Sequence, residues 1–186
     1  MNDGTSSRAP AAIREARVDD LPALQQIEVE AGRAFADIGM DSVASDDAFP
    51  LDVLLAYQAS GHAWVAVDDR DAPVGYLIVD LVDGNAHVEQ VSVRPSFGRR
   101  GIGRTLIDAV VQWARERGLA AVTLTTFRDV AWNGPYYARC GFRTLGPDEV
   151  TPGLAAIRRH ERDLGLDEWP RVCMRREVEP HASPGN

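Results

Sequence analysis

A basic segment that contains three glycines has the residue types expected of a phosphate-binding turn: Gly98-Arg99-Arg100-Gly101-Ile102-Gly103-Arg104. The unpaired N–H groups and the positive dipole end of a helix N-terminus attract anions, and glycines let a ligand approach the backbone. Arginine side chains add planar donors for phosphate oxygens. The segment therefore predicts an anion cradle, most simply for a pyrophosphate. The alternative is a tight strand-to-helix connection with solvated arginines, because Gly-x-Gly alone is a weak motif.

A predicted strand precedes this segment and a predicted helix follows it, and these two elements must position it. Residues 87–93 alternate with period two, which predicts a strand that stops before Pro95. After the glycines, helical spacing runs to Gly118, with apolar residues at Ile102, Leu106, Ala109, Val110 and Trp113. On an uninterrupted strand, the side chains of His87 and Glu89 would share one face with those of Val91 and Val93.

These elements together resemble the cofactor-binding motif of the GNAT N-acetyltransferase superfamily. Further along, residues 132–142 (Trp-Asn-Gly-Pro-Tyr-Tyr-Ala-Arg-Cys-Gly-Phe) resemble the second signature of that family, Tyr-x-x-x-Gly-Phe. Both motifs occur in family order and at family separation, and the resemblance covers roughly residues 13–178. Gly98 departs from the pattern, since the family usually has Gln or Arg there. We therefore expect Arg99 to supply one of the phosphate contacts.

The resemblance implies a mixed α/β fold with a central, mostly antiparallel twisted sheet of about six to seven strands, a parallel core pair and flanking helices. It also implies acetyl-CoA as the acyl donor. Backbone groups of Val91, Ser92 and Val93 would pair with the pantetheine arm. The pyrophosphate would be held by Arg99, Arg100, Gly101, Ile102, Gly103, Arg104 and Thr105. Asn133 would contact the pantetheine or cap the short helix that follows it.

Acetyl transfer from a thioester to an amine needs a base, donors for the oxyanion and a proton for the leaving thiolate. The base is needed because an alkyl ammonium titrates near pH ~10. Family members place Glu or His at the positions of His87 and Glu89. We expect Glu89 to be the base, directly or through water, with His87 as second choice or relay partner. The Tyr-x-x-x-Gly-Phe signature places the acid, close to the cofactor, at Tyr137.

Each of these three residues also has a purely structural alternative. Glu89 could pair with Arg14 or Arg143 across the sheet, and His87 could be an exposed residue at the start of its strand. Tyr137 could be a core tyrosine that is bonded to backbone. Two carboxylates of the first helix, Glu28 and Glu30, are expected to be solvated, and contact with a substrate ammonium is the less favoured reading.

The remaining elements follow from periodicity and turn residues. Strands are predicted at residues 13–16, 63–67, 74–82, 121–126, 141–145 and 171–178. Helices are predicted from residue 21 to about 35, and at 50–58, 134–139 and 154–164, with a loop at 37–50. Short turns imply an antiparallel meander up to residue 93, and a crossover places strand 121–126 parallel to strand 87–93. In the resemblance, the first two helices and their loop cover the acceptor site.

The amino-acid composition limits the domain organisation, the binding partners and the cellular location that we expect for this protein. A chain of 186 residues with 45% hydrophobic content predicts one domain, residues 13–178, between a disordered segment 1–12 and a flexible tail 179–186. The net charge of −8 disfavours nucleic acid and suits a cationic substrate. Two cysteines give no disulfide framework, and the chain has no signal peptide and no long apolar run, so we expect a cytoplasmic protein without membrane contact. The four histidines show no metal-ligand spacing.

These observations predict an acetyl-CoA-dependent N-acetyltransferase that acetylates a primary amine by direct attack in a ternary complex. The favoured acceptor is a small cationic metabolite or a drug-like amine. Acetylation of a protein N-terminus or lysine is an alternative, and so is a non-catalytic acyl-CoA-binding module. The sequence leaves homodimerisation open.

Overall fold

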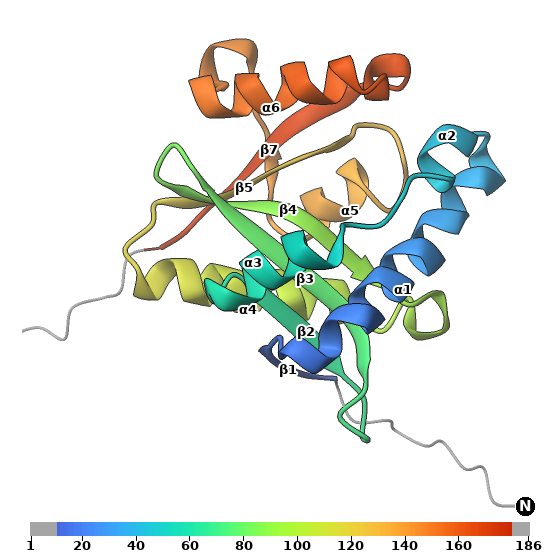
Figure 1. Ribbon diagram of the computed structural model, residues 1–186. Helices are drawn as coiled ribbons and strands as arrows, with labels where there is room; N and C mark the ends of the chain where they lie inside the picture. Colours follow the sequence, from blue (N-terminus) through green and yellow to red (C-terminus); the bar gives the residue numbers. More distant parts are fainter. Residues whose placement is uncertain (1–10, 180–186) are drawn as a thin grey trace, which may run out of the picture.

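Seven strands form one mixed sheet in the computed structural model, which describes residues 11–179 (Figure 1). The strands lie in the order β1-β2-β3-β4-β5-β7-β6. Every neighbouring pair is antiparallel except β4 and β5, which are parallel as predicted. The strands are β1 (Ala12–Glu15), β2 (Ala63–Val67), β3 (Pro73–Val82), β4 (Asn85–Val93), β5 (Ala121–Phe127), β6 (Arg143–Thr144) and β7 (Arg171–Glu177).

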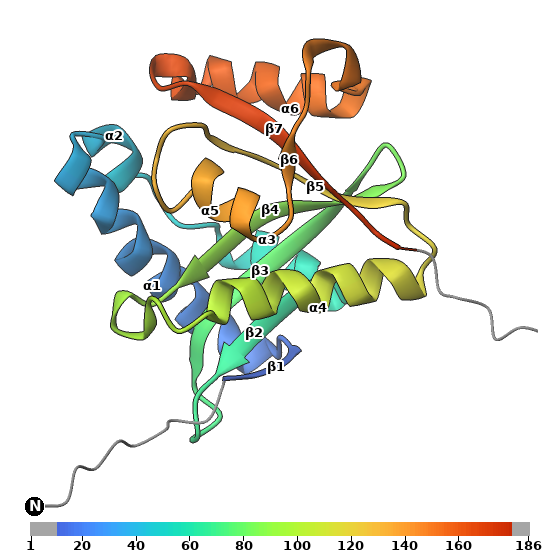
Figure 2. The same ribbon diagram turned by 180° about the vertical axis from the view of Figure 1, so that it is seen from behind.

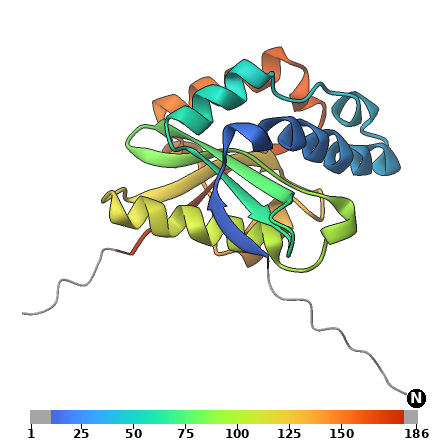
Figure 3. The same cartoon turned by 60° about the horizontal axis from the view of Figure 1, so that its bottom comes forward.

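Helices cover both faces of the sheet. One face carries α1 (Leu21–Gly32), α3 (Leu51–Ala59) and α6 (Pro152–Asp163), and the other carries α4 (Ile102–Glu116) and α5 (Gly134–Arg139) (Figures 2 and 3). The short helix α2 (Asp41–Ala44) follows α1. Single 3-10 turns complete the set at Val18–Asp20, Arg33–Ile38, Pro95–Phe97, Pro147–Glu149 and Leu166–Glu168.

The amphipathic pattern of α4 fixes this helix against the sheet. Its buried residues Leu106, Ile107 and Val110 are inaccessible to solvent and form one core with Leu77 and Val79 of β3. Burial of each such side chain contributes about 1.5–3 kcal/mol to the free energy of folding. On the opposite face, α1 and α3 pack on a second core through residues such as Leu24, Ile27 and Leu54. The central strands are therefore held from both sides.

A β-bulge at Glu89 interrupts the alternation of β4. Val88 lies opposite Val79 and Gln90 lies opposite the adjacent Ile78, so Glu89 is an extra residue without a partner on β3. The expectation that His87 and Glu89 share a face with Val91 and Val93 is therefore wrong. Val91 packs against the core under α4, whereas His87 lies opposite Asp80, which bonds to α3 on the other face. One inserted residue shifts the alternation of the strand by one step.

Several boundaries also differ from the prediction. Ala12 begins β1 and pairs with Val67, so it does not belong to a disordered segment; the rest of that segment up to residue 10, and the tail from residue 180, lie outside the described residues. The predicted loop 37–50 contains α2. β6 is limited to Arg143 and Thr144, because only these two residues pair with β7 after the left-handed turn at Gly141.

Candidate active site

The parallel strands β4 and β5 separate at the point where the bulge begins. They pair only from Ala86 to Val88, and the later residues of β4 have no partner on β5. The two strands diverge from there, and α5 lies between their ends (Figures 1 and 2). The splay leaves the edge of β4 that faces β5 without a strand partner beyond Val88, along the stretch that contains Val91, Ser92 and Val93. Free strand-edge groups of this kind can pair with an extended ligand arm.

The turn before α4 has the geometry of an anion cradle. Arg99 has a φ of 61° and Gly101 has a φ of 77°, both in the left-handed region. Left-handed residues next to a right-handed helix turn successive N–H groups toward one point, which makes a concave anion site. Arg99 is not a glycine, so its conformation stores strain of the kind found at binding sites. The site fits the pyrophosphate of a coenzyme A molecule.

The remaining residues of the cradle divide between backbone and side-chain roles. Ile102 is buried in the core, so only its N–H group can reach a ligand. Arg100 donates to the carbonyl of Ser96 over 3.0 Å and keeps an exposed guanidinium. Arg104 is exposed. The hydroxyl of Thr105 donates to the carbonyl of Gly101 over 3.1 Å and therefore stabilises the first turn of α4.

Gly103 makes room for a protein side chain rather than only for a ligand. A Cβ atom at this position would lie 2.8 Å from the hydroxyl oxygen of Tyr136. The hydroxyl of Tyr136 reaches the first turn of α4 and lies close to the Cys140 thiol. A substitution at Gly103 would therefore displace Tyr136, whatever it did to a ligand.

Asn133 presents an unused acceptor beside the splay. Its Oδ1 atom is buried and has no hydrogen-bond partner among the described residues. The side chain does not cap α5, so the capping alternative is wrong for this residue. A buried acceptor without a partner is uncommon in a native protein. It fits an amide N–H group of a bound pantetheine arm.

Glu89 carries an accessible carboxylate at the bulge. It forms neither of the ion pairs considered from the sequence, because Arg14 binds Asp20 and Asp71 and Arg143 binds Glu149. No cation pairs with Glu89 in the described part of the chain. The pKa of Glu89 is raised, chiefly because the surrounding protein desolvates it, and further by the charges of Asp80 and Glu161.

His87 is a buried residue rather than an exposed one. Only 1% of its surface is accessible, and its Nδ1 atom lies 3.0 Å from Oγ1 of Thr123. Burial lowers the pKa of His87 to about 4. The imidazole is therefore neutral near pH 7 and out of reach of a substrate. This geometry favours Glu89 over His87 as the base.

Tyr137 lies in the core beside the splay. Its ring packs edge-on against Phe142, with ring centroids 6.0 Å apart. The hydroxyl makes no hydrogen bond within residues 11–179, so the structure does not support the backbone-bonded alternative. Burial raises the pKa of Tyr137, which keeps its phenol protonated. The charge of Arg171 on β7 opposes this effect and lowers the pKa of Tyr137.

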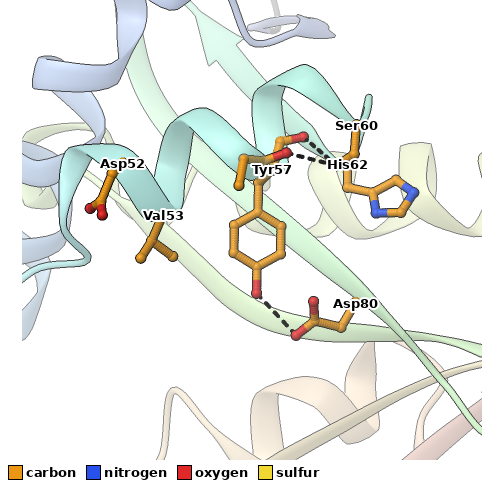
Figure 4. Close-up of a pocket in the computed structure, with 7 residues that line it drawn as sticks. Asp52, Val53, Tyr57, Ser60, His62 and Asp80 are labelled. Atoms are coloured by element: carbon orange, nitrogen blue, oxygen red, sulfur yellow. Dashed lines mark hydrogen bonds between the residues drawn. The ribbon is translucent and has the colours of Figure 1, made fainter.

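A hollow of about 460 Å³ lies between α3 and β3. Its lining residues come from α3, the turn after it and β3: Asp52, Val53, Ala56, Tyr57, Ser60, His62 and Asp80 (Figure 4). The hydroxyl of Tyr57 donates to Oδ2 of Asp80 over 3.0 Å. Sequence reasoning missed both residues. The one available signal was a single carboxylate, Asp80, in an otherwise apolar strand.

Neither of the two carboxylates on α1 is simply solvated, contrary to expectation. Oε2 of Glu28 accepts hydrogen bonds from the Tyr76 hydroxyl over 2.7 Å and from the Phe49 N–H group over 3.1 Å. Burial raises the pKa of Glu28. Glu30 forms a salt bridge with Arg94. Glu28 thus fastens the loop before α3 to α1 and β3.

Two arginines between α6 and β7 are already neutralised. Arg171 binds Glu161 over 2.7 Å, and Arg158 binds both Glu161 and Asp167. Glu89, Asp80 and Asp52 form no salt bridge within residues 11–179. Within the described residues, no group of three histidine, cysteine or acidic side chains could hold a metal ion. No helix in that same range is long and apolar enough to span a bilayer.

The parallel pair β4–β5, which opens beside the left-handed turn before α4, agrees with the arrangement expected from the resemblance to acetyltransferases. The chain belongs to the acetyltransferase (GNAT) family, whose model matches residues 22–142. The protein is therefore an acetyltransferase, and acetyl-CoA is its acyl donor.

The individual relatives share only a low sequence identity with this chain. The chain is 26% identical to an amino-acid acetyltransferase of Mycobacterium tuberculosis, over 84% of this chain and 82% of that protein. It is 25% identical to the peptidyl-lysine N-acetyltransferase YjaB of Escherichia coli, over 53% of this chain and 61% of that protein. The structure of the PaiA N-acetyltransferase from Thermoplasma acidophilum in complex with coenzyme A matches with a TM-score of 0.68 and 16% identity, over 91% of this chain and 99% of that one. This last likeness concerns the fold alone.

Proposed function

We propose that this acetyltransferase acts on the primary amine of a small cationic molecule, by direct attack in a ternary complex. The observation that carries the proposal is the unpaired, accessible carboxylate of Glu89 at the end of the β4–β5 pairing. Asp52 and Asp80, which line the hollow between α3 and β3, are two further carboxylates that form no salt bridge within the described residues, and such acidic side chains suit a cationic acceptor.

Glu89 is the proposed base. It takes a proton from the bound ammonium, directly or through one water, and so frees the nitrogen lone pair. Its raised pKa supports this role, because a stronger base abstracts the proton more readily. The accepted proton then leaves to solvent through the accessible side of Glu89.

Tyr137 is the proposed acid. Acetyl-CoA would supply an activated thioester carbonyl: the amine nitrogen would bond to the carbonyl carbon, and the C–S bond would break to release the thiolate of coenzyme A. The hydroxyl of Tyr137 is protonated and has no protein acceptor to hold it, so it is available to protonate the departing sulfur. Tyr137 then regains a proton from solvent. Free N–H groups of β4 beyond Val88 are positioned to donate to the carbonyl oxygen.

The relatives suggest two other acceptor classes, an amino acid and a peptidyl lysine. An amino acid brings a carboxylate, which calls for a free cation near Glu89. Arg171, whose charge acts on Glu89, is paired with Glu161, as is Arg158, and this pairing argues against that class. A lysine side chain is itself cationic and is compatible with the unpaired carboxylates.

A panel of amines separates these classes. Thiol release from acetyl-CoA is measured with a diamine, an uncharged-tail amine, an α-amino acid and a lysine peptide at matched concentrations. The proposal expects the highest kcat/KM for the small diamine and the lowest for the amino acid. The reverse order contradicts a cationic acceptor, and faster acetylation of the peptide shifts the assignment to proteins. If no amine is acetylated although CoA binds normally, the result contradicts the proposal and supports the alternative of a non-catalytic acyl-CoA-binding module.

A further inference from the structure

Two threonines of β5, only two residues apart, form hydrogen bonds in opposite directions across the sheet. Oγ1 of Thr123 lies 3.0 Å from Nδ1 of His87 on β4, within the short stretch where these two strands pair. The hydroxyl of Thr125 donates instead to Oε1 of Glu161 on α6. Side chains two residues apart on a strand lie on the same face of the sheet. Thr123 therefore ties β5 to β4, whereas Thr125 ties it to the helix that covers this face.

Thr125 stands at the point where β5 separates from β4. Leu124 is the last residue of β5 that pairs with β4, opposite Val88, and Thr125 follows it directly. The antiparallel ladder between β5 and β7 continues without interruption to the pair of Phe127 and Arg171. Beyond Leu124, β5 therefore stays beside β7 and leaves β4.

Glu161, which accepts the bond from Thr125, is itself held by two arginines. Arg171 of β7 donates to Oε1 of Glu161 over 2.7 Å and to Oε2 over 3.1 Å, and Arg158 of α6 forms a further salt bridge with this carboxylate. The Arg171 guanidinium also lies over the Phe127 ring, 4.4 Å from the ring centroid. The side chains of Arg171 and Glu161 are only 9% and 11% exposed, so solvent and salt screen this network little. The end of β5 is therefore attached to α6 and β7 through buried contacts.

An open slot between two neighbouring strands needs such an attachment. Strand edges without a partner favour pairing with each other, because every N–H group that finds a carbonyl gains a hydrogen bond. On β4 the bulge at Glu89 interrupts the regular alternation that pairing requires. On β5 the bond of Thr125 to Glu161 acts at the first residue beyond the pairing and opposes further closure.

We propose that Thr125 is a positioning residue of this enzyme: by its bond to Glu161 it holds the end of β5 away from β4, and so keeps the slot for the pantetheine arm of acetyl-CoA open before the cofactor binds. A slot that is open for only a fraction of the time binds its ligand more weakly, in proportion to that fraction. The inference concerns cofactor binding, so it holds whichever residue is the base and whichever amine is the acceptor.

Thr125→Val tests the inference, because valine keeps the β-branched shape that suits a strand and removes only the hydroxyl. Thr123→Val is the matched control: it makes the same substitution on the same face of the same strand, but the bond it removes joins β5 to β4. We expect Thr125→Val to bind CoA about three- to tenfold more weakly. Thr123→Val should bind CoA as wild type does, although it also loses a buried hydrogen bond. Thr125→Ser keeps the hydroxyl and should restore wild-type affinity.

The binding kinetics distinguish a closed slot from a general loss of structure. Calorimetry gives the affinity for CoA, and stopped-flow measurement of tryptophan fluorescence gives the two rate constants. The loss in Thr125→Val should lie in the association rate constant, because the ligand must meet an open slot, and the dissociation rate constant should stay the same. In the ligand-free variant, the backbone amides of residues 91–93 should also exchange their hydrogens more slowly, because they gain partners on β5.

A wild-type association rate constant in folded Thr125→Val overturns the inference, and so does unchanged amide exchange at residues 91–93. An equal loss of CoA affinity in the two valine variants also overturns it, because both changes would then act only through stability. If Thr125→Val does not fold, Thr125→Ala is measured in the same way, with the same expectations.

Discussion

The hydroxyl of Tyr136 occupies the space that a Cβ atom at Gly103 would need, with only 2.8 Å between the two positions. The α5 segment and the first turn of α4 are therefore in direct contact across the open end of the sheet. This contact joins the two sequence motifs of the family in one site. It also makes Gly103 unsuitable for a test of ligand binding, because a substitution there moves a protein side chain.

Gly101 offers a cleaner test of the phosphate cradle. Gly101 and Gly118 lie at the two ends of α4, both have a left-handed backbone, and neither has an atom within 4 Å of an added Cβ. Each change to alanine should cost about 1 kcal/mol of stability, because alanine resists this conformation. We expect Gly101→Ala to weaken CoA binding by at least about tenfold, equivalent to ~1.4 kcal/mol, and Gly118→Ala to leave it unchanged. Calorimetric titration decides, and equal affinities in the two variants would place the pyrophosphate elsewhere.

Glu89→Gln should lower the rate of acetyl transfer by about 10²–10⁴ if this carboxylate is the only base. The base works in its ionised form, so wild-type activity should fall as the pH decreases through the raised pKa of Glu89. This acid limb should therefore lie at higher pH than that of a solvated glutamate and disappear in the variant. The measurement is kcat/KM against pH, with Glu116→Gln on the exposed face of α4 as the control. Activity within a few-fold of wild type at every pH would rule Glu89 out.

Tyr137→Phe removes one hydroxyl and keeps the ring that packs against Phe142. Stability should change by about 1 kcal/mol or less, since the hydroxyl has no hydrogen-bond partner in the described residues. CoA affinity should stay the same, and single-turnover acetyl transfer should slow by roughly 10²-fold. Tyr136→Phe is the matched control and should keep the chemical step. Equal single-turnover rates in wild type and Tyr137→Phe would mean that Tyr137 only packs.

His87 should make the stability of the protein depend on pH. Burial depresses its pKa to about 4 in the folded state, whereas an unfolded histidine titrates near 6.5. Between these values the unfolded chain binds more protons, so folding loses stability as the pH falls, by up to roughly 3 kcal/mol. The contribution is fully present above pH ~6.5.

The variant His87→Gln should lose much less stability than wild type between pH 7 and pH 5, as measured by urea unfolding. It should also retain most of the acetyl transfer activity. An inactive but stably folded His87→Gln protein would restore His87 as a candidate for the base.

The sequence alone determined the elements whose signals are local. The pattern of Ile102, Leu106 and Val110 predicts α4, and the glycines before it predict the cradle, because helix periodicity and backbone freedom are properties of a few adjacent residues. The same holds for the strand boundaries at residues 63–67 and for α5. The preference for a right-handed strand–helix–strand crossover was enough to predict that β4 and β5 are parallel.

Only the tertiary structure decided which side chains meet. The bulge at Glu89 depends on the register of β4 against β3, and it places His87 and Val91 on opposite faces. The pairing of Tyr57 with Asp80 and the contact of Tyr136 with Gly103 join segments that are distant in the sequence. Such contacts depend on how strands pair and helices pack, and alternation within one strand carries no information about an extra residue in its pairing.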